Sequence, residues 1–271
     1  MFNLSNLVFF CVHLYVMIGI FDSGAGGLSV YREIVRLLPG ERYVYYSDNA
    51  HCPYGEKTRE YIIDRARSIT DFLLGEGCDV IVVACNTATA AAIASLRAEY
   101  EVPFIGMEPA VKQAALHTRS GVVGVLATAG TLKADKYHNT RDRFAEGVTV
   151  VERIGEGFVE LVESGALDGP EAEAVVRRSL EPLLDAGADM IVLGCTHYPF
   201  LMPLIRRIAG PGVTVIDPAP AAARHLLNVM KDRGLIRRDG QPAGIGDPKA
   251  ADIRLFSSGP RAALERIFSI L

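Results

Sequence analysis

Cysteine is scarce in this sequence, and no two cysteines are spaced as CxxC. The 271 residues contain five cysteines, an odd number, so a framework of paired disulfides is not expected. Reduced thiols are typical of proteins that work in the cytosol. The cysteine pattern therefore favours a cytosolic enzyme over a secreted disulfide scaffold.

Long runs of basic residues are missing as well. The formal net charge is −4, so nucleic acid is not expected as the primary partner. Hydrophobic residues make up 49% of the chain and charged residues 22%, which is an ordinary globular balance. The length is enough for one large domain or two modest ones.

The N-terminus lacks the features of a secretion signal. Residues 1–16 are apolar and aromatic, but no basic segment precedes them and no small-residue cleavage site follows. The run is too short to span a bilayer and is interrupted by His13, so no membrane partner is expected. We expect residues 1–16 to be an extension and Met17 to be the natural start. N-terminal sequencing that recovered Phe2 or Asn3 would contradict this.

One pattern occurs twice in the chain. Residues 77–87 and 187–197 both read Gly-x-Asp-x-Ile-Val-x-x-Cys followed by polar residues. Such a short apolar run predicts a strand buried on both faces, with the cysteine at its C-terminal end. Ligands bind at that end in open α/β sheets. The pattern thus places Cys85 and Cys195 at the mouths of two similar halves.

Strand and helix patterns alternate along both halves. This alternation predicts an α/β fold of two pseudo-symmetric lobes, each a mostly parallel sheet flanked by helices, with the active site in the cleft between them. The last strand and helix have no counterpart in the repeat, and we expect them to pack on the first lobe. The expected division is an extension at 1–16, a first lobe at 17–112 plus 222–271, and a second lobe at 113–221.

A glycine-rich turn follows the first expected strand. Asp22 ends that strand, and Ser23-Gly24-Ala25-Gly26-Gly27 leads into a helix that extends to about Leu38. Glycines at a helix N-terminus let backbone N–H groups approach an anion. The turn lacks both the G-x-G-x-x-G spacing and a P-loop lysine, so taken alone it favours an ordinary β–α turn.

The two strand-end cysteines differ from the other three. Each precedes polar residues at an expected helix start, where free N–H groups and the helix dipole should lower the thiol pKa. The pairs Asn86-Thr87 and Thr196-His197 could cap those helices and bind a carboxylate. Buried cysteines in two capped turns are the structural alternative. For Cys11, Cys52 and Cys78, a place in the core is the default expectation.

Two thiols on opposite sides of a small ligand suit a two-base proton transfer that inverts a stereocentre without a cofactor. A Cys–His nucleophile would use the same residue types but would leave Cys85 and the repeat unexplained. A zinc site is disfavoured because Cys195 and His197 are poorly spaced for one metal, and the sequence presents no further ligand cluster.

Four motifs resemble the glutamate racemases of the aspartate/glutamate racemase superfamily. They are Phe21-Asp22-Ser23-Gly24-x-Gly26-Gly27, Pro53-Tyr54-Gly55, Ala84-Cys85-Asn86-Thr87 and Gly194-Cys195-Thr196-His197. The resemblance implies that Cys195 deprotonates L-glutamate and Cys85 D-glutamate, without metal or pyridoxal phosphate. It also implies that the reaction supplies D-glutamate for peptidoglycan synthesis. For the assembly, we consider a homodimer. The implied substrate-contacting residues are Asp22, Ser23, Tyr54, Gly55, Asn86, Thr87, Thr196 and His197.

Two further points concern the second half. Glu163 matches an acidic residue of the family near the second thiol, although a solvated helix face is an equal alternative for it. Arg153-Ile154-Gly155 departs from an Ala-Cys-Pro segment of many members. An aspartate or hydantoin racemase, or a binding protein without activity, are the other functions considered. A positioned base alone contributes about 10²–10⁴-fold, so lobe closure around the substrate is also expected.

Overall fold

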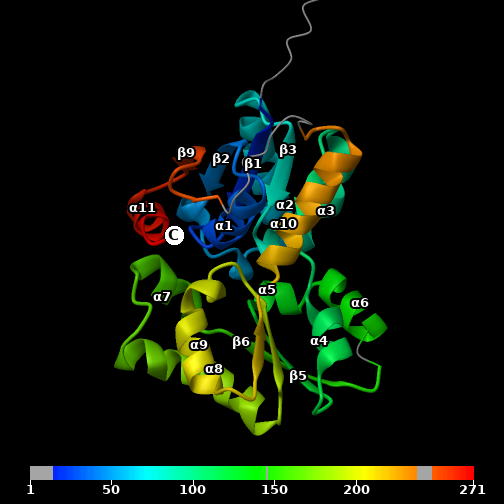
Figure 1. The fold of residues 1–271 in the computed structure, drawn as a ribbon, viewed down its shortest axis with the longest axis vertical. Coiled ribbons are helices and arrows are strands. Elements are labelled where there is room, and N and C mark those ends of the chain that lie inside the picture. The colour runs from blue at the N-terminus through cyan, green and yellow to red at the C-terminus, as the bar shows by residue number, and fades with distance from the viewer. Residues whose placement is uncertain (1–14, 145, 237–245) are drawn as a thin grey trace, which may run out of the picture.

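The computed structural model describes residues 15–144, 146–236 and 246–271. Two sheets form two lobes, which lie one above the other in Figure 1. Within these ranges, no helix has the length and apolar character needed to cross a bilayer. Most of the expected N-terminal extension (residues 1–14 of 1–16) and part of the expected loop at 239–252 lie outside the described residues.

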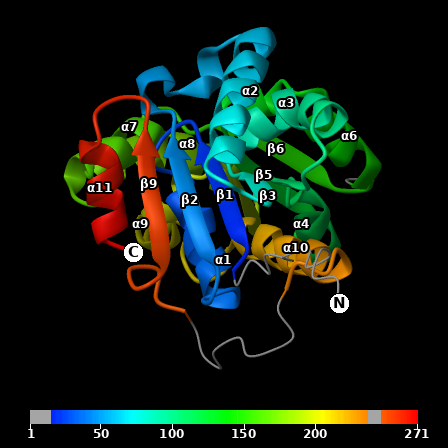
Figure 2. The same cartoon turned by 90° about the horizontal axis from the view of Figure 1, so that it is seen from above.

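The first lobe is built on a sheet in which every pair of neighbouring strands is parallel. From edge to edge, its strands are β4 (Phe104–Gly106), β3 (Val80–Val83), β1 (Met17–Asp22), β2 (Arg42–Ser47) and β9 (Asp252–Ser257). Figure 2 shows β2 between β1 and β9. The C-terminal strand therefore returns to the first lobe, as expected.

Helices cover both faces of this sheet. They are α1 (Leu28–Leu37) and α10 (Ala219–Asp232) on one face, α2 (Arg59–Gly75) and α3 (Asn86–Glu99) on the other, and α11 (Ala262–Ser269) after β9. Side chains of β1 alternate between the faces: Ile18 and Ile20 pack in the α1 cluster, and Phe21 packs in the α2–α3 cluster. Because both faces are buried, the strand reads as a continuous apolar run.

The second lobe repeats this plan. Its sheet is also parallel, in the order β6 (Thr149–Ile154), β5 (Val122–Ala127), β7 (Met190–Gly194) and β8 (Thr214–Ile216). The helices are α7 (Phe158–Ser164), α8 (Pro170–Asp185) and α9 (Met202–Ala209) on one side in Figure 1, and α4 (Val111–His117), α5 (Ala129–Leu132) and α6 (Asp135–Phe144) on the other.

The two sheets match strand for strand. Reversing the second order gives β8-β7-β5-β6, which corresponds to β4-β3-β1-β2, and β9 is the added edge. The glycines that open the two repeated patterns also match, since Gly77 and Gly187 both have φ of 84°. That left-handed conformation is one that glycine adopts without strain. The sequence repeat is therefore also a structural repeat.

The chain passes between the lobes at two points. Residues 107–110 lead from β4 to α4, and residues 217–218 lead from β8 to α10. Both crossings contain an acidic residue followed by proline and alanine: Glu108-Pro109-Ala110 and Asp217-Pro218-Ala219. The second crossing is held by a hydrogen bond from the Ala219 N–H to Asp217 Oδ1, at 2.8 Å.

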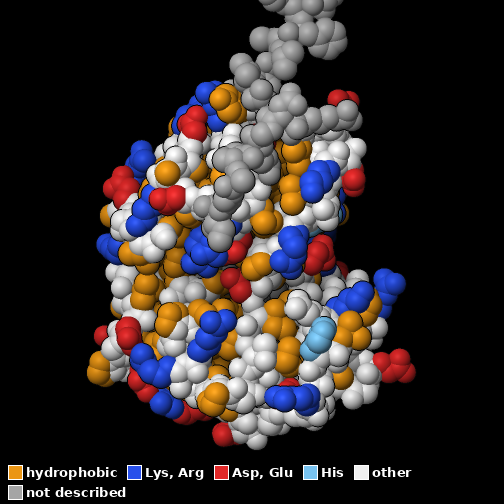
Figure 3. Space-filling view, viewed as in Figure 1, with side chains coloured by type: hydrophobic (Ala, Val, Ile, Leu, Met, Phe, Trp, Pro, Cys, Tyr) orange, Lys and Arg blue, Asp and Glu red, His pale blue; other side chains and the backbone are white. Residues whose placement is uncertain are grey.

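The α/β class and the parallel sheets were predicted correctly, but α4, α5 and α6 were not anticipated. The sequence of α6 is strongly polar, and Tyr137 is the side chain that it buries. Such a helix carries no apolar stripe to reveal it. On the surface, Figure 3 shows acidic and basic side chains interspersed over the visible face, in keeping with the small net charge.

Candidate active site

The turn after β1 is organised by Asp22, which is fully buried. Its Oδ2 accepts hydrogen bonds from the backbone N–H groups of Gly24 and Gly27, each at 3.1 Å. Burial raises the pKa of Asp22, and the nearby His197 and the two N–H groups only partly offset this. The glycine N–H groups thus bind a side chain of the protein itself, which agrees with an ordinary β–α turn and not with a phosphate loop.

Cys85 lies directly after β3 and caps the N-terminus of α3. Its Sγ accepts a hydrogen bond from the Ala88 N–H at 3.4 Å and donates one to Ser23 Oγ at 3.7 Å. Cys85 itself is the cap, so the expectation that Asn86-Thr87 caps this helix is wrong. Thr87 instead bonds Thr128, Thr196 bonds Asp22, and His197 pairs with Glu163.

The expectation of a lowered pKa at Cys85 is also wrong. Burial raises the pKa of the Cys85 thiol, and the negative charge of Asp22 raises it further. The Ala88 N–H and the Ser23 hydroxyl act in the opposite direction but are too weak to reverse it. Loss of water around the sulfur therefore outweighs the helix N-terminus, and Cys85 rests as a protonated thiol.

Cys195 follows β7 in a different setting. No α-helix begins at this cysteine: the short 3₁₀ turn Tyr198–Leu201 comes next, and His197 provides no side-chain cap. The Cys195 Sγ lies 3.8 Å from His197 Nδ1. On the other side of the ring, His197 Nε2 lies 2.7 Å from Glu163 Oε1. The second thiol therefore has an imidazole and a carboxylate behind it, and the predicted helix cap is absent.

The His197 ring is charged in this arrangement. Burial acts to lower its pKa, but the hydrogen bonds to Cys195 and Glu163 and the charge of Asp22 raise the pKa well above its ordinary value. The pKa of Glu163 is lowered, because the bonds to His197 and to the Ala25 N–H outweigh its burial. The Cys195 sulfur therefore lies beside a positively charged ring.

Hydrogen bonds tie this second turn to the first lobe. Thr196 Oγ1 donates to Asp22 Oδ1 at 3.1 Å, and Ser29 Oγ donates to the Thr196 carbonyl at 2.9 Å. The Ala25 N–H donates to Glu163 Oε1 at 2.7 Å. Asp22 and Ser23 therefore connect the surroundings of both thiols.

Asn86 and Thr87 follow Cys85 and lie at the junction of the lobes. Asn86 Nδ2 is buried and has no hydrogen-bond partner within the described part of the chain. A buried N–H group without a partner is costly, which points to a ligand acceptor such as a carboxylate. Thr87 Oγ1 lies 2.9 Å from Thr128 Oγ1 and 3.3 Å from Thr131 Oγ1, both on the second lobe.

Tyr54 and Gly55 form the wall beside this junction. The Tyr54 hydroxyl donates to Asp48 Oδ2 at 2.5 Å, and the same carboxylate is held by two bonds from Arg65. The hydroxyl is thus engaged within the first lobe, and the ring is buried in the core of that lobe. At Gly55, a Cβ would lie 3.1 Å from the Thr128 Cβ, so this glycine packs closely against the second lobe.

The thiols are covered. Cys85 is 5% exposed and Cys195 is 7% exposed. Two hollows open between the lobes, of about 450 Å³ beside Lys57, Thr87 and Lys133 and about 210 Å³ beside Gly55 and Tyr198, and neither is lined by these thiols. In this structure, therefore, both sulfurs are largely shielded from solvent.

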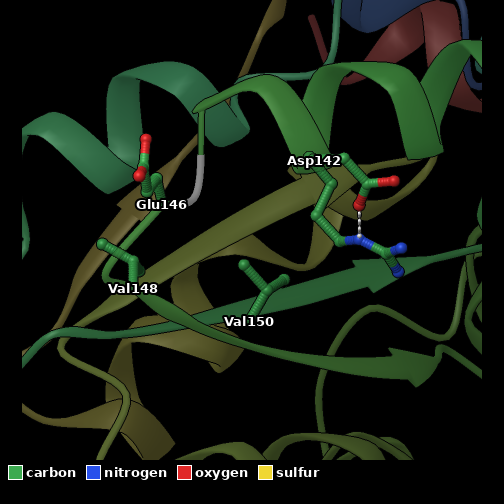
Figure 4. Close-up of a pocket in the computed structure, with 5 residues that line it drawn as sticks. Asp142, Glu146, Val148 and Val150 are labelled. Atoms are coloured by element: carbon green, nitrogen blue, oxygen red, sulfur yellow. Dashed lines mark hydrogen bonds and ion pairs between the residues drawn. The ribbon is translucent and has the colours of Figure 1, made fainter.

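A third hollow, of about 410 Å³, lies on the second lobe alone. Asp142, Glu146, Val148 and Val150 line it, as Figure 4 shows. Arg141, which also lines it, is paired with Asp142 at 2.9 Å and with Glu152 at 2.9 Å. Arg141 is thus paired within the protein, and the hollow includes no residue of the predicted site.

The sequence pattern does not clearly indicate that Glu163 and Cys52 belong to the site. Glu163 was weighed against a solvated helix face, but its side chain is only 21% exposed and binds His197. Cys52 was expected in the core, but it lies beside Glu163 and His197, and the ligand atoms of the three residues are all within 4.8 Å of one another. The sequence feature that could have placed Cys52 in the site is its position directly before the motif Pro53-Tyr54-Gly55. Cys78 is buried in the core as predicted, and Cys11 lies outside the described residues.

The segment that departs from the family pattern has a local explanation. At Gly155, a Cβ would lie 2.5 Å from the Tyr198 hydroxyl oxygen, and that hydroxyl donates to the Gly155 carbonyl at 3.3 Å. The glycine thus allows the buried tyrosine to approach the end of β6. The thiols are not touched by this difference.

Comparison with known proteins agrees with this geometry. The Asp/Glu/Hydantoin racemase family matches residues 18–226. A glutamate racemase of Roseiflexus sp. (strain RS-1) is 50% identical over 239 residues, 86% of this chain and 88% of the relative. A glutamate racemase of Pseudomonas aeruginosa is 49% identical over 255 residues, 94% of this chain and 93% of the relative.

The fold has the same neighbours. The structure of Escherichia coli glutamate racemase in complex with L-glutamate and the activator UDP-MurNAc-Ala matches with a TM-score of 0.81 at 32% identity. The match covers 94% of each chain.

Proposed function

The chain belongs to the Asp/Glu/Hydantoin racemase family, and we propose that it interconverts L- and D-glutamate by moving a proton between two thiols. The reaction is an isomerisation at Cα. One sulfur takes the proton of the Cα–H bond, and the opposite S–H gives its proton to the other face of the resulting carbanion. No electrons are exchanged with a cofactor, and none is proposed.

The observation that carries this proposal is the link between the surroundings of the two sulfurs. Cys85 contacts Ser23, and the adjacent Asp22 binds Thr196, which is adjacent to Cys195. Two cysteines from separate sheets thus flank one short turn. Burial as core residues alone does not require this link.

We assign the catalytic roles to Cys195 and Cys85. Cys195 deprotonates L-glutamate: the charged His197 lies 3.8 Å from its sulfur and is held from behind by Glu163. Cys85, whose pKa is raised by burial, is the protonated partner that completes the inversion. From D-glutamate the two exchange roles.

The substrate-binding roles fall to the polar residues around the thiols. The unpartnered Asn86 Nδ2 is the best-supported donor to a carboxylate oxygen. Donors aimed at the carboxylate stabilise the charge that develops when Cα loses its proton. The remaining assignments are Asp22, Ser23, Tyr54, Gly55, Thr87, Thr196 and His197.

Closure of the lobes belongs to the same proposal. The proposed lobes are residues 17–112 plus 222–271 and residues 113–221, supported by the strands that each sheet contains. The low exposure of both thiols supports a closed cleft that excludes water during proton transfer. Small-angle scattering should change when saturating glutamate is added, and an unchanged profile would count against closure.

Substrate choice is tested by following circular dichroism with L-glutamate and L-aspartate separately. Loss of the signal with L-glutamate and its persistence with L-aspartate are expected. The reverse result would assign the chain to aspartate, and an equivalent assay covers a hydantoin. No signal change with any of them would favour a binding protein.

We further propose that the protein works in the cytoplasm and that its reaction supplies D-glutamate for peptidoglycan synthesis. The mechanism needs two reduced cysteines, and the cytoplasm keeps thiols reduced. Neither nucleic acid nor a membrane is proposed as a partner, and a homodimer remains a prediction. Sedimentation at several protein concentrations tests the assembly.

A further inference from the structure

Cys52 is the cysteine of the site for which the proposed reaction has no role. It lies in the loop between the 3₁₀ turns Asn49–His51 and Tyr54–Glu56 and is partly exposed. The Cys52 thiol makes no hydrogen bond to any of the described residues of the chain. Glu163 from α7 and His197 from the turn after β7 face it.

The three side chains converge at a point where the chain has no side chain of its own. A Cβ built on Gly24 would lie 2.4 Å from Glu163 Oε1, 3.2 Å from Cys52 Sγ and 3.2 Å from His197 Nε2. The absence of a Cβ at Gly24 therefore lets a sulfur, a nitrogen and an oxygen come together against the backbone. The ligand atoms of Cys52, Glu163 and His197 all lie within 4.8 Å of one another, close enough to share one metal ion.

Acidic groups surround the three ligand atoms. Glu163 lies within 4.8 Å of the Cys52 sulfur, and Asp22 is near it as well. These acidic neighbours attract a positive ion. His197 is bound to Glu163 through Nε2 and gives up that proton when it serves as a ligand.

We propose that Cys52, Glu163 and His197 bind a thiophilic divalent cation such as Zn²⁺. Thiolate sulfur, imidazole nitrogen and carboxylate oxygen are the ligands that Zn²⁺ prefers, and three protein ligands leave a fourth position for water. The Cys52 thiol proton and the His197 Nε2 proton leave to solvent on binding. Because Glu163 and His197 are taken from their roles beside Cys195, the bound cation inhibits racemisation.

Binding is tested on the full-length reduced protein by titration with Co²⁺, whose bond to a thiolate gives a charge-transfer absorption. We expect one cation per chain in the parent. Cys52→Ala should lose the absorption and weaken binding by about 100-fold or more, since even partners of ligands cost 10–100-fold. Cys78→Ala removes a buried thiol elsewhere and should bind like the parent.

Two results would overturn the proposal. One is equal binding by Cys52→Ala and the parent. The other is loss of the absorption in Cys85→Ser with retention in Cys52→Ala, which would place the cation between the catalytic sulfurs. This titration needs no racemase activity, so its failure leaves the proposed function untouched.

Inhibition is then measured as the ratio of racemisation rates with and without Zn²⁺. The ratio should fall at least tenfold in the parent and in Cys78→Ala, and a chelator should restore it. In Cys52→Ala the ratio should stay near one. A parent that is not inhibited while it binds Co²⁺ at Cys52 would overturn the inhibitory role.

Discussion

The two cysteine turns began as copies of one sequence pattern, yet they present their sulfurs in different ways. In the first lobe, Cys85 caps a helix and contacts a hydroxyl, and its thiol is kept protonated by burial. In the second lobe, Cys195 has no helix to cap and faces a charged imidazole held by Glu163. The two halves thus share the strand and the position of the thiol, but they differ in the polar groups that contact the sulfur.

This difference suits a reaction that needs an acid and a base at once. From L-glutamate the proposed reaction uses Cys195 as the base and Cys85 as the acid, and from D-glutamate the two exchange these roles. The surroundings are unequal: burial raises the pKa of Cys85, whereas Cys195 lies beside the charged His197. The asymmetry of the repeat is therefore part of the proposed chemistry.

The largest expected effect comes from removing either sulfur. Cys85→Ser and Cys195→Ser should each lower racemisation by about 10³-fold or more, because the serine hydroxyl is a far weaker acid than a thiol. In D₂O, Cys85→Ser should still exchange the Cα proton of L-glutamate, and Cys195→Ser that of D-glutamate, both without inversion. Near-normal racemisation in either variant, followed by circular dichroism, would end the two-base mechanism.

A smaller effect tests whether His197 serves only the second thiol. Added to Cys85→Ser, the substitution His197→Asn should lower exchange from L-glutamate by about 10²-fold, because the cation beside Cys195 is lost. Added to Cys195→Ser, it should lower exchange from D-glutamate much less. NMR of the Cα proton measures both. Equal losses in the two backgrounds would mean that His197 binds substrate and does not distinguish the sulfurs.

The paired aspartates of the repeat offer a test of stability. Asp189 accepts hydrogen bonds from Thr118, Arg119 and Ser120, whereas Asp79 accepts one from the Met17 N–H. Although burial acts to raise it, the pKa of Asp189 is lowered by these bonds to about 2. A lowered pKa stabilises the fold above the unfolded value of 3.8, and this contribution is lost as the pH falls towards 2.

Asp189→Asn should therefore lower the free energy of unfolding at pH 6 by about 1 kcal/mol, after allowance for solvent screening of this partly exposed group. The deficit relative to the parent should shrink at pH 3. Urea unfolding at both pH values gives the measurement. Asp79→Asn is the matched control and should cost less at pH 6. If the difference in free energy of unfolding were the same at both pH values, the loss of stability would not come from the charge of Asp189.

The smallest expected effect concerns the contact between the lobes. Thr128→Val removes the hydroxyl that bonds Thr87 across the lobes and also caps α5 through Thr131. It should raise the KM for glutamate about threefold, with little change in kcat, since the one bond between the lobes contributes about 1 kcal/mol. Thr70→Val makes the same chemical change where the buried hydroxyl has no partner in the described chain. That control should leave KM unchanged. Steady-state kinetics on both variants measure KM and kcat, and an equal KM in the two variants would contradict the prediction.

Much of this arrangement could be read from the sequence. Apolar runs that ended in cysteine and polar residues located β3 and β7, and the alternation of strands and helices led to the parallel sheets. The thiols to which we assign the catalytic roles lie in the same repeat. These features could be predicted because each depends on neighbours in the sequence.

What could not be predicted depends on distant neighbours. The pKa of Cys85 is set by burial and by Asp22, and the helix start that the local pattern shows does not decide it. The role of Cys52 depends on α7 and on the turn after β7, which lie more than a hundred residues along the chain. Likewise, α6 is held by its place in the lobe, since its own residues are polar.

The two crossings between the lobes determine how the cleft can open. A body attached at two points turns freely only about the line through both, so the lobes share a single hinge axis past Glu108-Pro109-Ala110 and Asp217-Pro218-Ala219. Each proline fixes its own φ and thereby stiffens the connecting segment in which it lies. If the lobes close as proposed, we therefore expect a rotation about this axis without twist, which would return the two sulfurs to the same alignment in each cycle.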